Sequence, residues 1–515
     1  MKHWSALVWL LAFVGALALR CPRLADRPLH GDEAVNATKL VELWETGHYQ
    51  YDPTEYHGPT LHYFALPFLW LSSAKNSAEL SEATLRVITV AFGVGLLLLL
   101  LLLSDGLGHA AVAWAAVFLA VSPAMVFYSR YFIHEMPLIF FTLLTFAAGW
   151  RYARSRRLGW ALLAGAGLGL MWATKETFVL SVAAGGIVLA VEHFWNRRRE
   201  IVEKKIPRFS RAHFAFAVLA AVAVAQLFFS SFLTNLHGPV DSLKTFLPWL
   251  NRAGGASPHL HPWSFYWERL LWFHPAKGPV WSEAGIFILA LIASVAAFSS
   301  NRRVGFRPRL VRLLTGYTFT LAAIYSVIAY KTPWCLLNFW LGMILLAGVG
   351  AATLLRLCGS RPAKFLTLTV ITLVAVHLAW EARRAAVDFA ASPRNPYTYS
   401  QTAEGCRELV QRIEALANLT DTGTDTVVKV IAPESYWPLP WYLRAFKNVG
   451  WWEQMPRDSA APIVIVSARL GAALDEKSNH SYLMTGLYEL RPGVFLELYV
   501  ERGLWEKFIA SLPRS

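Results

Sequence analysis

Charge and cysteine are both scarce in this sequence. Charged residues make up 16% of the 515 residues, against about 25% in an average soluble protein. The four cysteines, Cys21, Cys335, Cys358 and Cys406, have neither CxxC nor Cys/His zinc spacing, so neither a disulfide framework nor a zinc site is indicated. A P-loop and a Rossmann glycine fingerprint after a strand are also missing, which argues against a nucleotide-binding fold.

Long apolar runs are abundant instead. Hydrophobic residues reach 55% of the sequence, and several stretches approach the roughly 20 apolar residues that cross a bilayer. We therefore predict a mainly α, polytopic membrane protein with about 11 (10–13) transmembrane helices, whose boundaries are good to about four residues. The predicted spans are 4–20, 86–104, 110–127, 135–152, 159–173, 177–194, 212–234, 281–299, 310–330, 335–356 and 364–381.

The charge distribution predicts which side each loop faces. The net charge is +14, but the basic residues gather in loops 151–158, 195–211, 300–312 and 356–364, which share one side and are therefore cytoplasmic. This clustering also argues against nucleic acid as a partner. The first apolar run favours an uncleaved span over a signal peptide. We expect a multi-pass inner (plasma) membrane protein with a cytoplasmic N-terminus.

The outer side carries the polar segments. Loop 21–60 holds seven acidic and three basic residues. The apolar segment 61–71 is short, which favours an interfacial or re-entrant helix over a span, and 235–280 is a long outer loop. We predict three parts: a transmembrane domain at 1–382, a linker at 383–402 and a soluble extracytoplasmic α/β domain at 403–515. In the last, we expect a helix at 404–417, strands at 427–432 and 462–466, and a hairpin around 491–493.

Candidate catalytic residues follow the first predicted span, in the sequence His30-Gly31-Asp32-Glu33. Two acids and a histidine can supply a general base and its orienting partner. Sugar transfer to a hydroxyl needs such a base, because the hydroxyl loses its proton as the new bond forms. Gly31 lets the backbone bring the carboxylates close to a ligand. The alternative is a solvated acidic turn.

Four further outer segments carry candidate ligands. Singly, each charged residue could snorkel to lipid headgroups or favour a helix end. Together on one face they favour a site, because ionisable groups at a membrane boundary usually face a cavity or a partner. We predict Glu135 as a further catalytic carboxylate. The predicted substrate and phosphate ligands are His30, Tyr56, His57, Arg130, His134, Lys175 and Lys331.

The order of these motifs resembles the GT-C superfamily of membrane glycosyltransferases, which includes protein O-mannosyltransferases and the aminoarabinose transferases of lipid A. The likeness covers roughly residues 1–380 and rests on Asp32-Glu33, 58–63, Arg86, Ser129-Arg130 with Glu135, Thr174-Lys175 and 331–334. The strings at 30–34, 51–59 and 437–444 are similar to a prokaryotic flippase-associated family of poorly defined biochemistry, over nearly the whole chain.

This resemblance implies inverting transfer from a polyprenyl-phosphate sugar at the outer face. Asp32 would match the catalytic base, and Glu33 or Glu135 a supporting acid. Candidate phosphate ligands would be Lys175, Arg130, His57 and Lys331. One departure concerns the second acidic motif, where relatives often carry an Asp and this chain has His134-Glu135.

The leading hypothesis is therefore a glycosyltransferase that moves a sugar from a polyprenyl-phosphate donor to a lipid-linked glycan, a lipid or a protein. The rival is a non-enzymatic protein that binds lipid-linked glycans or assists a flippase, using the same basic pocket. A solute transporter fits less well, because such proteins place polar groups at mid-membrane and often show internal repeats. Expected partners are the donor, membrane lipid, and a flippase or envelope glycan machinery. A divalent metal at the acidic pair is left open, because a monophosphate leaving group does not demand one.

Overall fold

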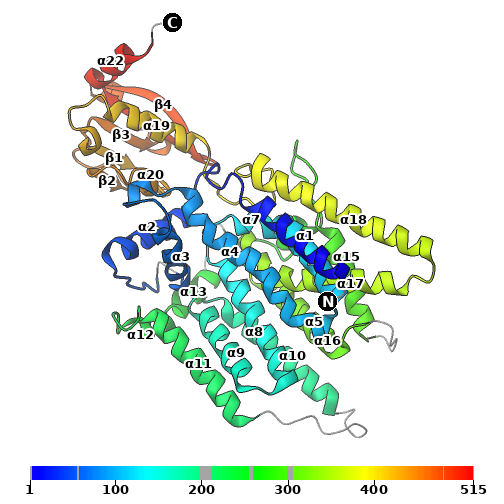
Figure 1. Cartoon of the computed structure of the whole chain (residues 1–515). Helices are drawn as coiled ribbons and strands as arrows, with labels where there is room; N and C mark the ends of the chain where they lie inside the picture. Colours follow the sequence, from blue (N-terminus) through cyan, green and yellow to red (C-terminus); the bar gives the residue numbers. More distant parts are fainter. Residues whose placement is uncertain are drawn as a thin grey trace.

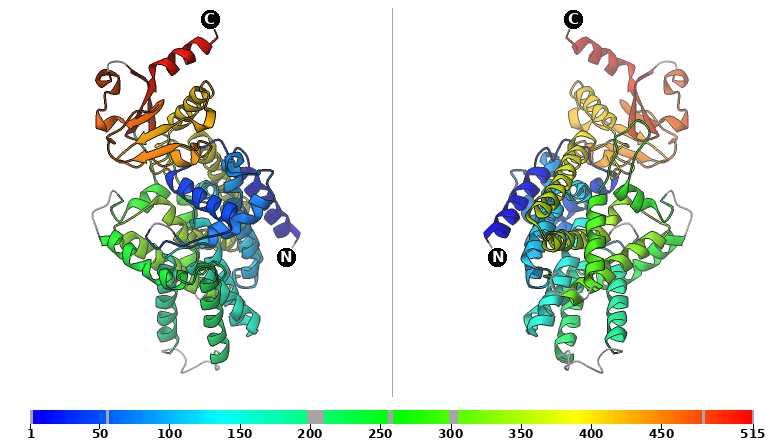
Figure 2. Two further views of the ribbon diagram at one scale, coloured as in Figure 1. Left: turned by 90° about the vertical axis from the view of Figure 1, so that its left-hand side faces the viewer. Right: turned by 90° about the vertical axis from the view of Figure 1, so that its right-hand side faces the viewer.

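The computed structural model describes residues 3–54, 57–197, 210–254, 259–298, 305–478 and 481–513. Long helices form a bundle, and a small α/β unit lies at one end of it (Figures 1 and 2). Every predicted span coincides with a helix. These helices are α1 (His3–Arg20), α4 (Glu82–Leu100), α6 (His109–Val121), α8 (Glu135–Ser155), α9 (Leu158–Trp172), α10 (Phe178–Arg197), α11 (Arg211–Phe229), α15 (Ala284–Phe298), α16 (Pro308–Val327), α17 (Leu337–Leu357) and α18 (Arg361–Arg383).

The number of predicted spans is not confirmed by helix length and composition. Five helices in the described residues are long and apolar enough to cross a membrane, and a sixth span results if α6 and α7 (Pro123–Ser129) count as one. These two helices meet at a bend of 60°. Four further apolar helices, α1, α9, α10 and α15, contain only 10–17 residues in their apolar part.

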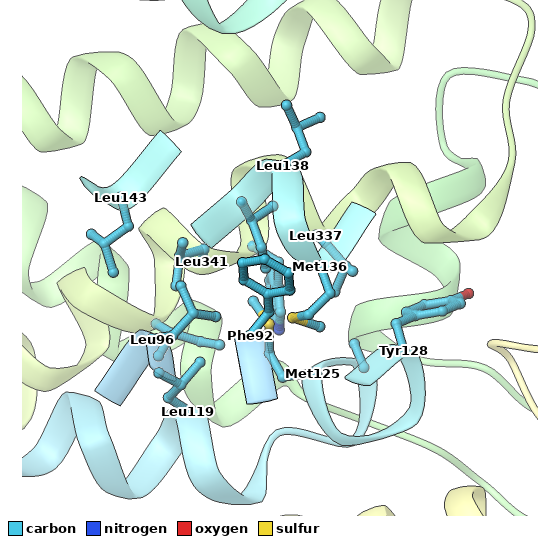
Figure 3. Packing of buried hydrophobic residues seen from close by; sticks show 14 of the residues in the cluster. Phe92, Leu96, Leu119, Met125, Tyr128, Met136, Leu138, Leu143, Leu337 and Leu341 are labelled. Carbon is cyan, nitrogen blue, oxygen red and sulfur yellow. The ribbon is translucent and has the colours of Figure 1, made fainter. Parts of the chain in front are cut away.

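Helix α17 is the centre of the bundle, and most of its residues are buried. It packs against α6, α15 and α16. Gly348 and Gly350 permit this approach, because a Cβ at these positions would lie 2.4 Å from the Ala111 carbonyl oxygen and 2.0 Å from that of Leu289. Small residues at helix contacts are typical of membrane bundles. Figure 3 shows the core beside α17, where leucine, methionine and aromatic side chains from several helices meet.

The predicted outer loops contain short helices that the sequence interpretation missed. Loop 21–60 includes α2 (Gly31–Thr46), which buries Ala34, Ala37, Leu40 and Leu43. Its apolar face is narrow and half alanine, so the helical period is weak in the sequence. The predicted interfacial segment 61–71 is helix α3 (Thr60–Trp70). The other short helices are η1 (Ser77–Glu79), η2 (Leu101–Leu103), α5 (Ser104–Leu107), α12 (Gly238–Lys244), α13 (Phe246–Gly254), α14 (Phe265–Leu271), η4 (Pro333–Leu336) and η5 (Arg384–Asp388).

The C-terminal unit confirms the elements predicted for it. Helix α19 (Gly405–Ala417) covers a five-stranded sheet of order β2-β1-β3-β5-β4. Strand β1 pairs in parallel with β2 and β3, whereas β5 is antiparallel to β3 and β4. The bounds are β1 (Val428–Ile431), β2 (Val449–Trp452), β3 (Ile463–Ser467), β4 (Tyr482–Arg491), β5 (Val494–Glu501), η6 (Gly423–Asp425), α20 (Leu439–Tyr442), η7 (Ala468–Leu470), α21 (Leu474–Lys477) and α22 (Arg502–Ser511). The predicted hairpin is β4–β5, with Gly493 at φ +79° in its turn.

Candidate functional site

A cavity of about 370 Å³ lies where α2, the 53–57 segment, the α9–α10 connection, α13 and the 328–335 segment meet. It is at the end of the bundle that carries the C-terminal unit, whereas the last turn of α10 and the first turn of α11 lie at the opposite end (Figure 2). Half of the ten predicted site residues line the cavity, namely Asp32, His57, His134, Glu135 and Lys175. Tyr56 lies outside the described residues.

Asp32 stands in the first turn of α2, and 56% of its side chain is exposed. His30 caps this helix: its Nδ1 accepts from the Asp32 amide at 3.1 Å, and Glu33 Oε2 accepts from the His30 amide at 3.0 Å. The cap leaves the Asp32 carboxylate directed away from the buried side of the helix. Asp32 is therefore placed to accept a proton from a group inside the cavity.

Glu33 is fully buried and does not line the cavity. Its carboxylate accepts from Arg27 Nη2 at 3.1 Å, from Arg86 Nε and Nη2 at 2.8 Å each, and from the Phe132 amide at 2.9 Å. Burial raises the pKa of Glu33, but Arg86 and Arg27 outweigh burial and lower it to about 2. In this structure Glu33 joins the segment after α1 to α4 and to the segment after α7.

Arg130 and Lys331, two predicted phosphate ligands, are not brought into the cavity lining. The Arg130 guanidinium donates to the carbonyl oxygens of Arg20, Pro22 and Arg23 at 2.6–3.0 Å. The Lys331 ammonium donates to the carbonyl oxygens of His261 and Ile328. Both side chains are at least 94% buried, so each holds a loop in place here.

Two ion pairs form the charged wall of the cavity. Lys175 contacts Glu135, and both side chains are almost fully buried. His57 Nδ1 lies 2.9 Å from Glu176 Oε2. Burial raises the pKa of Glu176, but His57 and Lys175 outweigh burial and lower it to about 2. Burial lowers the pKa of Lys175, but Glu135 outweighs burial and raises it. Lys175 is therefore a permanent positive charge at the cavity surface.

Gly58 holds the His57 loop against the α9–α10 connection. Its amide donates to the Thr174 carbonyl at 3.1 Å, and its own carbonyl accepts from His134 Nε2 at 3.0 Å. A Cβ at Gly58 would lie 2.1 Å from the Ala173 carbonyl oxygen. The close approach therefore requires glycine, and it sets the positions of His57 and His134 together.

Gly58→Ala is expected to lower stability by roughly 1–3 kcal/mol, the usual cost of overpacking, because the His57 loop must move away from the α9–α10 connection. Thermal unfolding of the purified protein tests this. Gly149→Ala is the matched control, because a Cβ at Gly149 meets no atom within 4 Å. Equal behaviour of the two variants would contradict the close approach.

The comparisons with known proteins agree with this architecture. Residues 53–235 match the model of the dolichyl-phosphate-mannose-protein mannosyltransferase family. No curated protein matches the sequence. Among solved structures, ArnT from Cupriavidus metallidurans bound to undecaprenyl phosphate has a TM-score of 0.66 and 14% identity, covering 98% of this chain and 99% of ArnT. The apo oligosaccharyltransferase of Archaeoglobus fulgidus has a TM-score of 0.57 and 13% identity, covering 87% of this chain and 64% of that one.

The chain has the GT-C fold of these membrane glycosyltransferases. This bears out the predicted GT-C likeness, and the helices that are long and apolar enough to cross a membrane agree with a polytopic membrane protein. The narrower resemblance to a flippase-associated family stays a prediction. Identities of this size establish a common GT-C fold, and the roles of single residues rest on this chain's own geometry.

The C-terminal unit contributes to this cavity, which the sequence pattern did not predict. Trp437 lines the cavity. Tyr442 Oη accepts from the Leu29 amide at 2.8 Å and donates to Glu82 at 3.0 Å. Thr402 Oγ1 donates to the Leu29 carbonyl at 2.6 Å. The residues that lead into α2 are thus held by the C-terminal part of the chain. The family likeness of the motif 437–444 pointed to this segment. Its partners could not be read from the sequence, because Leu29 and Glu82 are more than 350 residues away from Tyr442.

Other lining residues of the cavity were not among the predicted site residues. Glu176 pairs with His57, and aromatic side chains surround the remaining wall. These are Trp249, Tyr266, Tyr325, Tyr330, Trp334 and Trp437. Trp249 and Tyr266 lie in the predicted outer loop 235–280, but a bilayer interface uses aromatic residues of the same kind. Within the described residues, no group of three or more His, Cys, Asp or Glu side chains is arranged to hold a metal ion.

Buried histidines beside the site predict sensitivity to acid. Burial, followed by the nearby Lys39, lowers the pKa of His62 from 6.5 to about 3. The unfolded chain therefore binds a proton that the folded chain rejects in this range. We expect the free energy of unfolding to fall as the pH falls from 6.5 towards 3, and to fall less in His62→Phe. Thermal unfolding against pH measures this; identical pH profiles would contradict it.

Proposed function

We propose that this GT-C protein transfers a sugar from a polyprenyl-phosphate donor to an acceptor hydroxyl at the extracytoplasmic face, with inversion at the anomeric carbon. The observation that carries the proposal is the exposed Asp32 carboxylate, which faces the same cavity as the buried Lys175–Glu135 pair and the His57–Glu176 pair. A base and a lysine that can hold phosphate in one cavity are what transfer from a lipid phosphate requires.

The steps follow from this arrangement. The donor phosphate lies against Lys175 and His57, where the Lys175 ammonium and a ring N–H of His57 donate hydrogen bonds that stabilise the phosphate as it departs. The acceptor oxygen attacks the anomeric carbon and gives its proton to Asp32. The bond between that carbon and the phosphate oxygen breaks at the same time, and polyprenyl phosphate leaves. The ammonium group of Lys175 has three donors, so it can bind phosphate without releasing Glu135.

Helices α12 and α13 suggest where the lipid chain enters. Leu243, Leu247 and Leu250 are each more than half exposed on the outer surface. On the same segment, Pro248 and Trp249 line the cavity. Such amphipathic segments insert their apolar face at the membrane interface. The polyprenyl chain would then stay in the outer leaflet while its phosphate reaches the cavity. A flippase or envelope glycan machinery as a partner remains a prediction.

The test is release of polyprenyl phosphate from a panel of polyprenyl-phosphate sugars by the full-length protein in lipid nanodiscs. Mass spectrometry detects release, including slow transfer to water. Turnover of one donor that depends on Asp32 supports the proposal. Tight binding of donors without any release, with or without added acceptors, would instead establish the non-enzymatic rival.

Lys175→Gln is expected to weaken polyprenyl-phosphate binding by about tenfold or more, because a hydrogen bond to a charged group is worth roughly 1.5–3 kcal/mol. Binding to nanodisc-embedded protein measures this. Lys75→Gln is the matched control, since Lys75 is exposed in an outer loop and does not line the cavity.

The double variant Lys175→Gln with Glu135→Gln separates binding from folding. It removes the unpaired buried carboxylate that the single variant leaves behind, so stability should recover. Phosphate affinity should stay low. Recovery of both properties would show that Lys175 serves the fold and not the donor.

A further inference from the structure

A second cavity of about 270 Å³ lies beside the first, between the start of α2 and the C-terminal unit. The two cavities share six lining residues, among them Asp32, Trp334 and Trp437. Asp32 therefore faces both spaces. With the lipid-phosphate sugar in the first cavity, as proposed above, a hydroxyl in the second could reach the same carboxylate.

The chemistry of the second cavity differs from that of the first. Its described lining contains four aromatic residues, Tyr330, Trp334, Tyr399 and Trp437, and four hydroxyl residues, Thr332, Ser400, Thr402 and Ser435. His30 and His259 complete its polar surface. Aromatic rings offer flat apolar faces, and hydroxyl and imidazole groups donate and accept hydrogen bonds. This combination suits a sugar, which has apolar faces and a rim of hydroxyl groups.

Charged and acyl ligands fit this space poorly. Arg491 is the cation among the described lining residues, and its guanidinium already donates to the carbonyl oxygens of Trp437, Glu434 and Ser435. Val35 is the aliphatic residue of the lining. A phosphate would therefore find one guanidinium whose donors are already partly engaged, and an acyl chain would find no apolar channel.

The size and the backbone of the cavity agree with a small, specific ligand. A volume of about 270 Å³ is just below the roughly 300–1,000 Å³ of sites for drug-sized ligands, which limits the occupant to one or two sugar rings. Ser400 and Ser435 have φ of +48° and +84°. Non-glycine residues in this left-handed region carry strain, which concentrates at binding sites.

We propose that the second cavity is the acceptor subsite, and that the acceptor is the terminal sugar of a glycan. This inference rests on the proposed function. The accepting sugar hydroxyl gives its proton to Asp32 from the second cavity, and its oxygen bonds to the anomeric carbon presented in the first. The C-terminal unit contributes Trp437 and Ser435 to this subsite, so it takes part in acceptor recognition.

The experiment measures binding without turnover. Saturation-transfer NMR is recorded on the full-length Asp32→Asn variant in nanodiscs, with chitobiose, cellobiose and maltose as probes. At least one disaccharide should receive saturation.

Tyr399→Ala, added to the Asp32→Asn variant, should weaken binding of that disaccharide by roughly fivefold or more, because truncation of a buried aromatic contact residue typically causes the largest losses of affinity. Trp263→Ala is the matched control, since Trp263 is exposed and lines neither cavity. His259→Ala replaces Tyr399→Ala if that variant fails to fold.

The outcomes separate this inference from the proposed function. No saturation of any disaccharide, or saturation that Tyr399→Ala and His259→Ala leave unchanged, overturns the glycan subsite. A threonine peptide that competes with the bound disaccharide also overturns it. Absence of donor turnover by the wild-type protein, with intact disaccharide binding by the Asp32→Asn variant, would overturn only the proposed function. Dodecyl maltoside compared with maltose then shows whether the glycan is lipid-anchored or free, because tighter Tyr399-dependent binding of the alkylated sugar indicates an anchor.

Discussion

Replacement of Asp32 by asparagine is expected to slow sugar transfer by at least about a hundredfold, the usual contribution of a general base. The amide keeps the size of the carboxylate but cannot accept the proton of the attacking hydroxyl. The cap of α2 should survive, because the His30 ring bonds to the backbone amide of residue 32 and not to its side chain. Product formation from a donor that the wild-type protein turns over measures the effect.

Protein level, membrane insertion and thermal unfolding are the controls for this variant. All three should match the wild type, because the Asp32 side chain is more than half exposed. Donor binding should also persist, since the phosphate contacts are assigned to Lys175 and His57. An Asp32→Asn protein that transfers sugar at the wild-type rate would remove Asp32 from the mechanism.

The neighbouring change, Glu33→Gln, is expected to give the opposite phenotype. Glu33 is fully buried and accepts hydrogen bonds from Arg27, Arg86 and two backbone amides. Removing its charge leaves two buried arginines without their partner, and breaking a buried pair typically costs roughly 3–5 kcal/mol. We expect a melting temperature several degrees lower and a reduced yield of folded protein. Thermal unfolding in detergent measures this.

The pH dependence of stability provides a second measurement. The pKa of Glu33 is lowered from 4.5 to about 2 in the folded protein. Its stabilising contribution is thus complete above pH 4.5 and is lost as the pH falls from 4.5 towards 2. The Glu33→Gln variant should lack this part of the acid transition. If Glu33→Gln were as stable as the wild type but lost as much activity as Asp32→Asn, Glu33 would be a catalytic carboxylate.

These two carboxylates show the limit of motif reading. The string His30–Glu33 indicated a pair of acids at the outer face, and family likeness suggested roles for both. Which acid faces the cavity depends on helix α2: consecutive residues of a helix point about 100° apart, so one turns outward and the next inward. The helix was not predicted, because its buried apolar face is narrow and half alanine. The predicted phosphate ligands Arg130 and Lys331 were misassigned for a similar reason. Their side chains donate to backbone carbonyl oxygens that no sequence pattern reveals.

The sequence by itself determined the long apolar helices and the elements of the C-terminal unit, because hydropathy and strand or helix periodicity are local properties of the chain. The order of its motifs indicated the GT-C likeness. The sequence also named the cationic residue that lines the cavity, Lys175, and the exposed carboxylate, Asp32. Only the tertiary structure decided that Glu176 pairs with His57 and that Trp437 lines both cavities together with Asp32. Those contacts join segments more than 100 residues apart, and packing alone selects them from the many polar and aromatic side chains on the outer face.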